Sequence, residues 1–213
     1  MKISVLTPSI RPAGLEYTRA ALMQQTFKDF EWLVDINWTG THDLNAAYNR
    51  LLRRAKGELI VSLQDYITVR PDYLQRFWEA YQEHPDTFFT APVGKVDNLE
   101  FKPPAKWDWR AYQDAKPDWK CWEIDSGAAP RAALFEIGGF DEELDRDWSC
   151  DNLNVGCRAN LAGYRFANLF DNPAIAYDHD AHIPHPFRDN FRPIFNDLRM
   201  KDFEAGLKID FLH

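Results

Sequence analysis

The stretch GELIVSLQDYITVRPD, residues 57–72, carries the features that decide the fold. Its apolar run Leu59–Leu63 has the length and composition of a buried β-strand. A carboxylate, Asp65, follows the run, and Pro71 then suits the first turn of a helix. The stretch therefore predicts a buried strand with an acidic side chain at its tip, followed by a helix.

The residues after this stretch continue the same alternation of strand and helix. Leu74, Phe77, Trp78 and Tyr81 fall at positions i, i+3, i+4 and i+7, which predicts one buried helical face. Thr87–Ala91 then has the β-branched and aromatic composition of another strand.

The residues before the stretch show two further strand–helix pairs. We expect strands at Ile3–Leu6 and Glu31–Ile36, and helices at Leu15–Gln25 and from a cap at Thr41 or Asp43 to about Lys56. The first ninety residues thus alternate strand and helix, which favours a parallel sheet with right-handed crossovers.

The second half of the chain is less regular. Residues 92–124 show no clear period, and a segment this long without structure is usually functional. Beyond it we expect short helices at 131–137 and 151–162, the second closed by Gly163, and strands at 164–167 and 174–177. A helical tail is expected at about 190–203.

These patterns predict one α/β domain over residues 1–213, with a mostly parallel sheet flanked by helices. Residues 1–95 would form a ligand-binding half, and residues 96–180 a second half with an irregular region. Residues 181–213 would form a C-terminal tail that is partly helical.

Bulk composition excludes several classes of protein. The net charge is −8 and the pI about 5.2, so a general nucleic-acid footprint is not expected, although a local basic groove stays open. Three cysteines without a CxxC pair suggest reduced thiols. With no signal-like N-terminus and no apolar run near about 18 residues, we expect a soluble cytoplasmic protein without a membrane span.

Polar side chains follow three of the predicted strands at their carboxyl ends. Thr7 and Ser9 follow the first, Asp35 the second, and Gln64 and Asp65 the third. Ligands of open α/β sheets bind beyond these ends, so the three sets favour one site, although each residue alone could be an ordinary turn residue.

Two asparagines support this site. Asn45 and Asn49 lie at i and i+4 on the predicted helix, and therefore on one face that could contact a nucleotide or only water. Neither GxGxxG nor GxxxxGK[ST] occurs, so dinucleotide and P-loop sites are not supported.

Several segments, in order, resemble a known family: ISVLTPSIRP, QQTFKDFEWLVD, LNAAYNRLLRRAKGELIVSLQDY, GGFDEEL and WSCDNLNVGCRANLAGYRF. They resemble the motifs of the family 2 glycosyltransferases, which have the GT-A fold, and the resemblance covers about residues 1–180. It implies an enzyme that transfers a sugar from a nucleoside-diphosphate sugar, such as a UDP-sugar, to a hydroxyl acceptor with inversion. The acceptor would be a saccharide or other glycoconjugate, with a modified nucleic acid left open, and the sequence does not indicate an oligomeric state.

The resemblance implies donor contacts at the strand ends and on the helix between the second and third strands. The residues implied are Thr7, Pro8, Ser9, Arg11, Asp35, Asn45, Asn49, Gln64 and Asp65. A divalent cation, Mn²⁺ or Mg²⁺, would stabilise the leaving diphosphate.

For the metal, the family carries Asp-x-Asp or Asp-Asp where this chain has Gln64-Asp65-Tyr66. We therefore expect Asp65 to hold the cation with help from His179, or from His182 behind it. A metal-independent enzyme that uses Arg188 or Arg192 on the diphosphate is the alternative.

For the general base, the resemblance points to Asp151 at the start of the last predicted helix of the domain. An alignment on Arg158 instead places Asn152 there, and Asp147 is a further candidate. Trp148 would form an acceptor platform, with Gly127 nearby, while the Trp-rich segment 105–123 and the tail after Pro184 would shape the acceptor groove.

Two other classes of function stay open. The changes at Gln64, Tyr66 and Asn152 are compatible with a catalytically inactive sugar or nucleotide-sugar binding module. A nucleotidyltransferase is the third class, but TPSIRPAGLEY lacks the Gly-rich basic loop expected for it.

Overall fold

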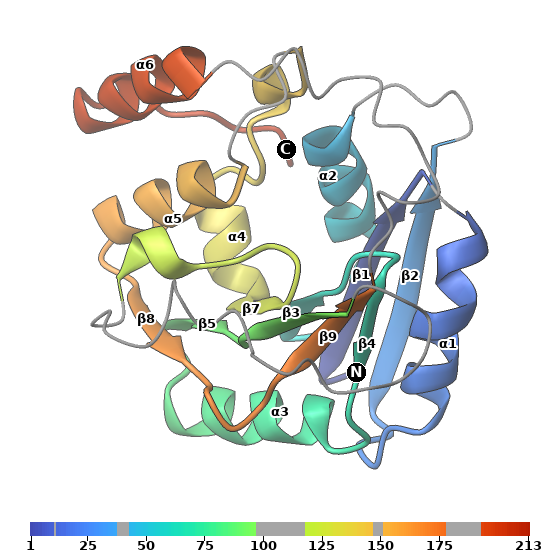
Figure 1. Cartoon of the computed structure of the whole chain (residues 1–213). Coiled ribbons are helices and arrows are strands. Elements are labelled where there is room, and N and C mark those ends of the chain that lie inside the picture. The colour runs from blue at the N-terminus through green and yellow to red at the C-terminus, as the bar shows by residue number, and fades with distance from the viewer. Residues whose placement is uncertain (11, 38–42, 97–117, 147–150, 178–192) are drawn as a thin grey trace.

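The computed structural model describes residues 1–10, 12–37, 43–96, 118–146, 151–177 and 193–213 (Figure 1). His179, His182, Arg188, Arg192, Arg11, Thr41, Asp147 and Trp148 lie outside these residues.

A central six-stranded sheet carries the fold. Its order is β2 (Phe30–Ile36), β1 (Ile3–Ser9), β3 (Leu59–Ser62), β7 (Gly127–Pro130), β5 (Thr87–Thr90) and β8 (Arg165–Asn168). The pairs β1–β2, β1–β3 and β5–β8 are parallel. The predicted mixed α/β class with a mostly parallel sheet is confirmed.

One feature of this sheet was not predicted from the sequence. The strand β7 lies between β3 and β5 and is antiparallel to both. Its small side chains, Ala128 and Ala129, are buried between the two neighbouring strands. A local pattern indicates a strand but does not say which strand becomes its neighbour, so this insertion could not be read from the sequence.

A second, three-stranded sheet was not predicted as a unit. It has the order β4 (Ile67–Val69), β9 (Ala174–Tyr177) and β6 (Val93–Val96). Only β9 was expected, and at these bounds. The strand β4 has only three residues, and β6 lies in the segment 92–124 that shows no clear period, so neither has a pattern that predicts a strand.

Helices cover both faces of the central sheet (Figure 1). Their bounds are η1 (Pro12–Gly14), α1 (Leu15–Met23), α2 (Leu44–Arg54), α3 (Tyr73–Glu83), η2 (Trp119–Cys121), α4 (Arg131–Glu136), η3 (Glu142–Arg146), α5 (Asp151–Leu161) and α6 (Pro193–Glu204). The longer predicted helices are confirmed with ends shifted by a few residues, and Gly163 closes α5 with φ +89° as expected.

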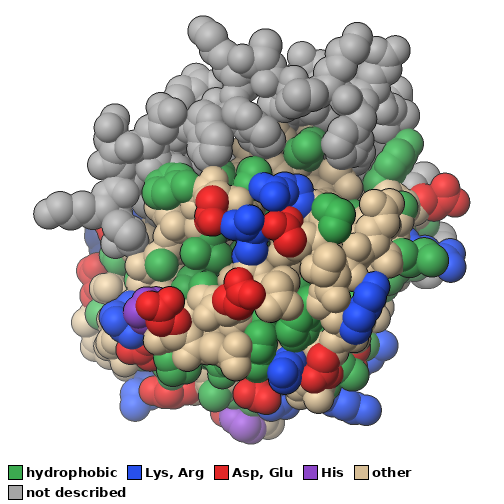
Figure 2. Space-filling model, turned by 90° about the horizontal axis from the view of Figure 1, so that it is seen from below, with side chains coloured by type: hydrophobic (Ala, Val, Ile, Leu, Met, Phe, Trp, Pro, Cys, Tyr) green, Lys and Arg blue, Asp and Glu red, His purple; other side chains and the backbone are tan. Residues whose placement is uncertain are grey.

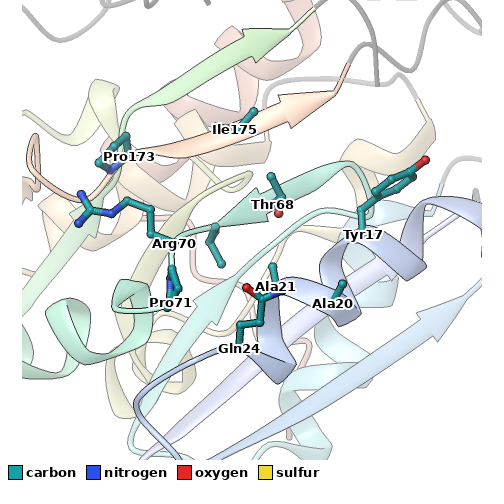
Figure 3. Close-up of a pocket in the computed structure, with 10 residues that line it drawn as sticks. Tyr17, Ala20, Ala21, Gln24, Thr68, Arg70, Pro71, Pro173 and Ile175 are labelled. Atoms are coloured by element: carbon teal, nitrogen blue, oxygen red, sulfur yellow. The ribbon is translucent and has the colours of Figure 1, made fainter. Parts of the chain in front are cut away.

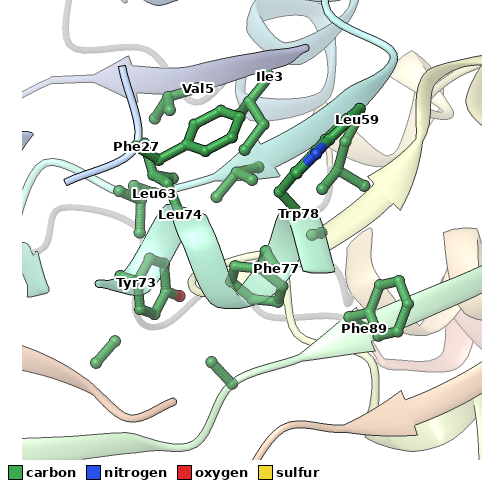
Figure 4. Close-up of a cluster of buried hydrophobic side chains, with 14 of the residues drawn as sticks. Ile3, Val5, Phe27, Leu59, Leu63, Tyr73, Leu74, Phe77, Trp78 and Phe89 are labelled. Carbon is green, nitrogen blue, oxygen red and sulfur yellow. The ribbon is translucent and has the colours of Figure 1, made fainter. Parts of the chain in front are cut away.

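The strands feed two cores because successive side chains point to opposite faces. On one face, Val5, Val61 and Phe89 pack with Phe77 of α3, as Figure 4 shows for this cluster. The predicted face of α3 is confirmed: Leu74, Phe77 and Trp78 are buried, and Tyr81 packs at the edge of the cluster.

On the opposite face, the alternate residues of the same strands meet α2, α4 and α5. Leu6, Ile60 and Phe88 pack there with Tyr48 and Leu134. The Tyr48 ring stacks on Phe140 with ring centroids 4.8 Å apart, and Phe140 belongs to the turn that follows α4. This second core therefore joins the helices of the two halves of the chain.

The surface gives no sign of a nucleic-acid footprint on the face shown in Figure 2. There, Lys and Arg side chains of the described residues are interspersed with Asp and Glu. Among the helices that the structure describes, none combines the length and apolar character needed to cross a bilayer.

Candidate functional site

The carboxyl ends of β1, β2 and β3 meet at one edge of the sheet. Ser9 pairs with Ile36, and Leu6 with Ser62, so the three strands end close together. Thr7, Pro8 and Ser9 lie on β1, Asp35 on β2, and Gln64 and Asp65 directly after β3. The structure thus brings these predicted residues to a common edge.

Asp65 and Ser9 are in direct contact at this edge. The Ser9 hydroxyl donates to Asp65 Oδ2 over 2.7 Å, and the Asp65 side chain is buried. The backbone of η1 packs against the same residue, because a Cβ on Gly14 would lie 2.2 Å from the Asp65 carbonyl oxygen. Thr7 is also buried and accepts a hydrogen bond from Trp32 Nε1 over 2.9 Å.

Asp35 is bound by an arginine from α2. Arg50 donates to both Asp35 carboxylate oxygens, over 2.8 and 3.0 Å, and also to Asp43 over 2.8 Å. The hydrogen bond with Asp35 is the main cause that raises the pKa of the Arg50 guanidinium above its usual range. A nucleoside that binds Asp35 would therefore either share the carboxylate with Arg50 or displace the Arg50 guanidinium from it.

Asn49 makes buried hydrogen bonds to the turn that follows α4. Its amide nitrogen donates to the Phe140 carbonyl and to Glu142, each over 2.9 Å, and its oxygen accepts from the Phe140 N–H over 2.8 Å. Because the side chain is fully buried, these contacts give Asn49 a structural role, holding the turn after α4 against α2.

Asn45 is likewise committed to a contact between the two halves. Its backbone N–H and its side-chain amide both donate to Asp145 Oδ1 over 2.9 Å, and the Ala46 N–H donates to Asp145 Oδ2 over 3.0 Å. Asp145 of η3 therefore caps α2 from about 100 residues away. Of the two expected caps, Thr41 or Asp43, Asp43 occupies the N-cap position of α2, but its carboxylate makes no capping hydrogen bond and accepts from Arg50 and Asn37.

Burial raises the pKa of the Asp145 carboxyl group. Loss of contact with solvent is the main cause that raises the pKa of Asp145 from 3.8 to about 6. The hydrogen bonds from Ala46 and Asn45 lower this pKa, and the negative charge of Asp43 raises it. The folded protein therefore binds this proton more tightly than the unfolded chain does. The stability contributed by the group is present at low pH and is lost as the pH rises through about 6.

We expect Asp145→Asn to remove this pH dependence. Between about pH 4 and pH 7, the unfolding free energy of the variant should gain up to about 3 kcal/mol relative to wild type, since each unit of pKa shift corresponds to about 1.4 kcal/mol. Urea unfolding of both proteins at the two pH values measures the difference. A difference that does not change with pH would show that burial of this carboxylate carries no cost.

The segment 122–126 carries two carboxylates, Glu123 and Asp125, near the end of β3. Neither was predicted from the sequence. Tyr66 donates its hydroxyl proton to Asp125 Oδ2 over 2.9 Å, and Asn152 donates to Glu123 Oε2 over 3.0 Å. The alternation of Trp122 and Ile124 with the two acids is the signal in the sequence that indicates them, and it stands at the end of the irregular segment 92–124.

Of the residues predicted on the acceptor side, the structure describes Gly127 and the start of α5, but not Asp147 or Trp148. The helix α5 begins at Asp151, as expected, and Asn152 is turned toward Glu123 and the Trp122 carbonyl. Gly127 lies on β7, where a Cβ would come within 2.2 Å of the Glu123 carbonyl oxygen. Protein atoms fill the space beside Gly127, so its absent side chain permits close packing against the Glu123 backbone and the Trp122 ring.

Arg158 is part of the protein interior. Its guanidinium donates to the Ile137 carbonyl over 2.7 Å and to Asn154 over 3.0 Å, and burial lowers its pKa to about 10. It ties α5 to the end of α4, which is a structural role.

The described residues do not build a metal site by themselves. Among them, no three His, Cys, Asp or Glu side chains gather closely enough to hold a cation. The predicted partner of Asp65, His179, lies outside the described residues, and Asp65 itself is buried against Ser9.

A separate pocket of about 600 Å³ lies between α1, β4 and the residues around the start of β9 (Figure 3). It is lined by Tyr17, Ala20, Ala21, Gln24, Thr68, Val69, Arg70, Pro71, Pro173 and Ile175. None of the residues predicted to bind a ligand lines it.

Comparison with solved structures identifies the fold. The chain superposes on S. aureus TarS 1–349 in complex with UDP-GlcNAc with a TM-score of 0.63 at 16% identity, covering 96% of this chain and 72% of that one. GalNAc-T7 with UDP, GalNAc and Mn²⁺ gives a TM-score of 0.65 at 12% identity, covering 83% and 44%. Both have the GT-A fold, so the GT-A fold predicted from the motifs is confirmed.

The chain covers only part of the length of these structural neighbours. In a second TarS 1–349 structure the chain spans 60% of the neighbour, and it spans 37% of TarS itself. No protein-family model and no curated protein sequence matches the chain.

Proposed function

We propose that this protein is a glycosyltransferase that moves a sugar from a uridine-diphosphate sugar to a hydroxyl acceptor. The observation that carries the proposal is the position of Ser9, Asp35 and Asp65 at the carboxyl edge of a GT-A sheet. Ligands of open α/β sheets bind at such edges. The structural neighbours TarS and GalNAc-T7 have been solved with UDP or a UDP-sugar.

On the donor side, Thr7, Pro8, Ser9 and Asp35 are our candidates for the nucleoside, with Arg11 beyond β1. Gln64 and Asp65 follow β3 and would lie toward the diphosphate. We leave Asn45 and Asn49 out of this set, because their side chains are buried in contacts with Asp145 and Phe140.

On the acceptor side, Asp151 is our candidate general base, with inversion at the sugar carbon. The acceptor oxygen would attack the anomeric carbon as the bond to the diphosphate breaks, and the hydroxyl proton would pass to the Asp151 carboxylate. A carboxylate at the start of a helix is stabilised by the helix dipole, which suits a base that must be ionised before it accepts the proton. Diphosphate departure would be aided by a divalent cation if His179 completes a site with Asp65, which the described residues alone do not provide.

A thermal-shift panel tests the proposal. Nucleoside diphosphates and nucleotide sugars are added with and without Mn²⁺, because a ligand that binds only the folded state raises the melting temperature. We expect UDP and at least one UDP-sugar to raise it by several degrees when in large excess. If no member of the panel shifts the transition, the transferase proposal fails.

Asp65→Ala is expected to weaken binding of the UDP-sugar at least about tenfold, because a charged hydrogen-bonding group at the donor edge is lost. Titration calorimetry with and without EDTA measures the effect, and circular dichroism checks the fold. Loss of affinity only in the presence of Mn²⁺ would assign Asp65 to a cation, whereas equal loss in EDTA would make it a direct sugar or ribose contact. Unchanged affinity in both conditions would remove Asp65 from the site.

A nucleotide-sugar binding module without activity is the second candidate. The observation that favours it is Asn152, which follows Asp151 and is hydrogen-bonded to Glu123. An amide cannot accept the acceptor proton. If Asp151 does not do so either, the protein would bind the donor without transferring the sugar.

A further inference from the structure

The segment from Trp122 to Ser126 runs through a turn at residues 124–126 into β7, and its residues alternate in burial. Trp122, Ile124 and Ser126 are 2%, 5% and 0% exposed, whereas Glu123 and Asp125 between them are only partly buried. The two carboxylates are therefore the partly exposed side chains of a segment whose other residues enter the core.

Buried hydrogen bonds fix this segment at the ligand edge of the sheet. Ser62, the last residue of β3, and Tyr48 both donate to the Ile124 carbonyl, and Ser126 donates to the Ala91 carbonyl over 2.7 Å just beyond β5. Tyr73 of α3 donates to the Ser126 carbonyl over 3.1 Å. Asp125 is thus held between two anchored residues and is not part of a freely moving loop.

The two carboxylates are connected to different sides of the proposed site. Glu123 is hydrogen-bonded to Asn152, next to the start of α5. Asp125 accepts from Tyr66, which directly follows Asp65 in the chain. Asp125 therefore belongs to the donor side, and Tyr66 sets the position of its carboxylate.

We propose that Asp125, positioned by Tyr66, binds hydroxyl groups of the sugar that is transferred. This inference rests on the proposed transferase function and names a residue that determines which sugar the site accepts. Sugar hydroxyls are hydrogen-bond donors, and a carboxylate is a strong acceptor for them. A carboxylate would repel the diphosphate, so the hydroxyl-bearing part of the donor is the part that Asp125 suits.

The test compares a nucleotide with and without its sugar. Dissociation constants of wild type and Asp125→Asn are measured for UDP and for a panel of UDP-sugars that includes UDP-GlcNAc. We expect the variant to lose about tenfold affinity for the best-bound UDP-sugar, while its affinity for UDP changes less than about twofold. Glu83→Gln, which removes one exposed negative charge at the end of α3, is the matched control and should change neither.

Tyr66→Phe tests the positioning role. It keeps the ring and removes the hydroxyl that donates to Asp125, so a smaller loss, about threefold and again confined to the UDP-sugar, is expected. A tyrosine with a merely structural role would lower the affinity for UDP and UDP-sugar alike.

The outcomes separate this inference from the proposed function. A wild-type protein that binds neither UDP nor any UDP-sugar overturns both. Wild-type binding of UDP, with equal losses for UDP and UDP-sugar in Asp125→Asn, overturns the sugar contact only. Equal losses that vanish in EDTA would make Asp125 a cation ligand, and that result also overturns the sugar contact.

Discussion

Gly138→Ala is expected to lower the free energy of unfolding by about 3 kcal/mol or more. Gly138 has φ +82°, a conformation in which an L side chain is strained, and a Cβ there would lie 1.9 Å from the backbone oxygen of Ile209. Backbone cannot move aside as a flexible side chain can. The substitution would therefore push the C-terminal segment away from the turn.

The contacts around this turn explain why the effect should be large. The Phe211 N–H donates to the Gly138 carbonyl over 2.9 Å, and Arg53 of α2 donates to the Phe211 carbonyl. Asn49 holds the next residues of the turn through Phe140. Displacement of Ile209 would thus disturb contacts between α2, the turn and the C-terminal residues together.

Gly163→Ala is the matched control for this prediction. Gly163 also has a positive φ, +89°, but no atom lies within 4 Å of the Cβ that would be added. Its replacement should cost only the backbone strain, about 1–2 kcal/mol. Urea unfolding of both variants measures the two effects, and equal losses would show that the contact with Ile209 yields without cost.

Asp151→Asn is expected to lower the rate of sugar transfer at least about 100-fold, because a positioned general base contributes about 10²–10⁴ in rate. The amide has nearly the same size but cannot accept the acceptor proton. Because we propose Asp151, the first residue of α5, as a group of the acceptor side, affinity for the UDP-sugar should change less than about twofold. Single-turnover transfer and calorimetry measure the two quantities separately.

Asp147→Asn is the comparison variant for the general base. A full rate loss in Asp147→Asn with normal transfer in Asp151→Asn would reassign the base to Asp147. If neither variant changes a measurable rate, a carboxylate base on this segment is excluded. A wild-type protein that binds the UDP-sugar but transfers it to no acceptor would favour the binding module.

Local sequence patterns were sufficient for the elements that bury one regular face. Leu74, Phe77 and Trp78 repeat at the helical period, and all three are buried in the core as expected. Leu59–Leu63 reads as a buried strand for the same reason, and its carboxyl end brought Asp65 to the ligand edge. These features depend on residues close in the chain, so their spacing alone predicts them.

Asn45 and Asn49 show what local spacing does not predict, which is the partner of a helix face. Their spacing correctly placed both on one face of α2, but spacing does not say what that face meets. Only the folded chain brings Asp145 and Phe140 against it, from about 100 residues further on. Those contacts make the two asparagines structural.

The sequence by itself thus determined the alternation of strands and helices and the sheet edge at which Thr7, Ser9, Asp35 and Asp65 meet. The tertiary structure decided the insertion of β7 between β3 and β5, the cap that Asp145 provides for α2, and the position of Asp125 beside Tyr66. The physical reason is that periodicity is a local property. Strand pairing and buried hydrogen bonds between distant residues depend on which surfaces the whole chain brings together.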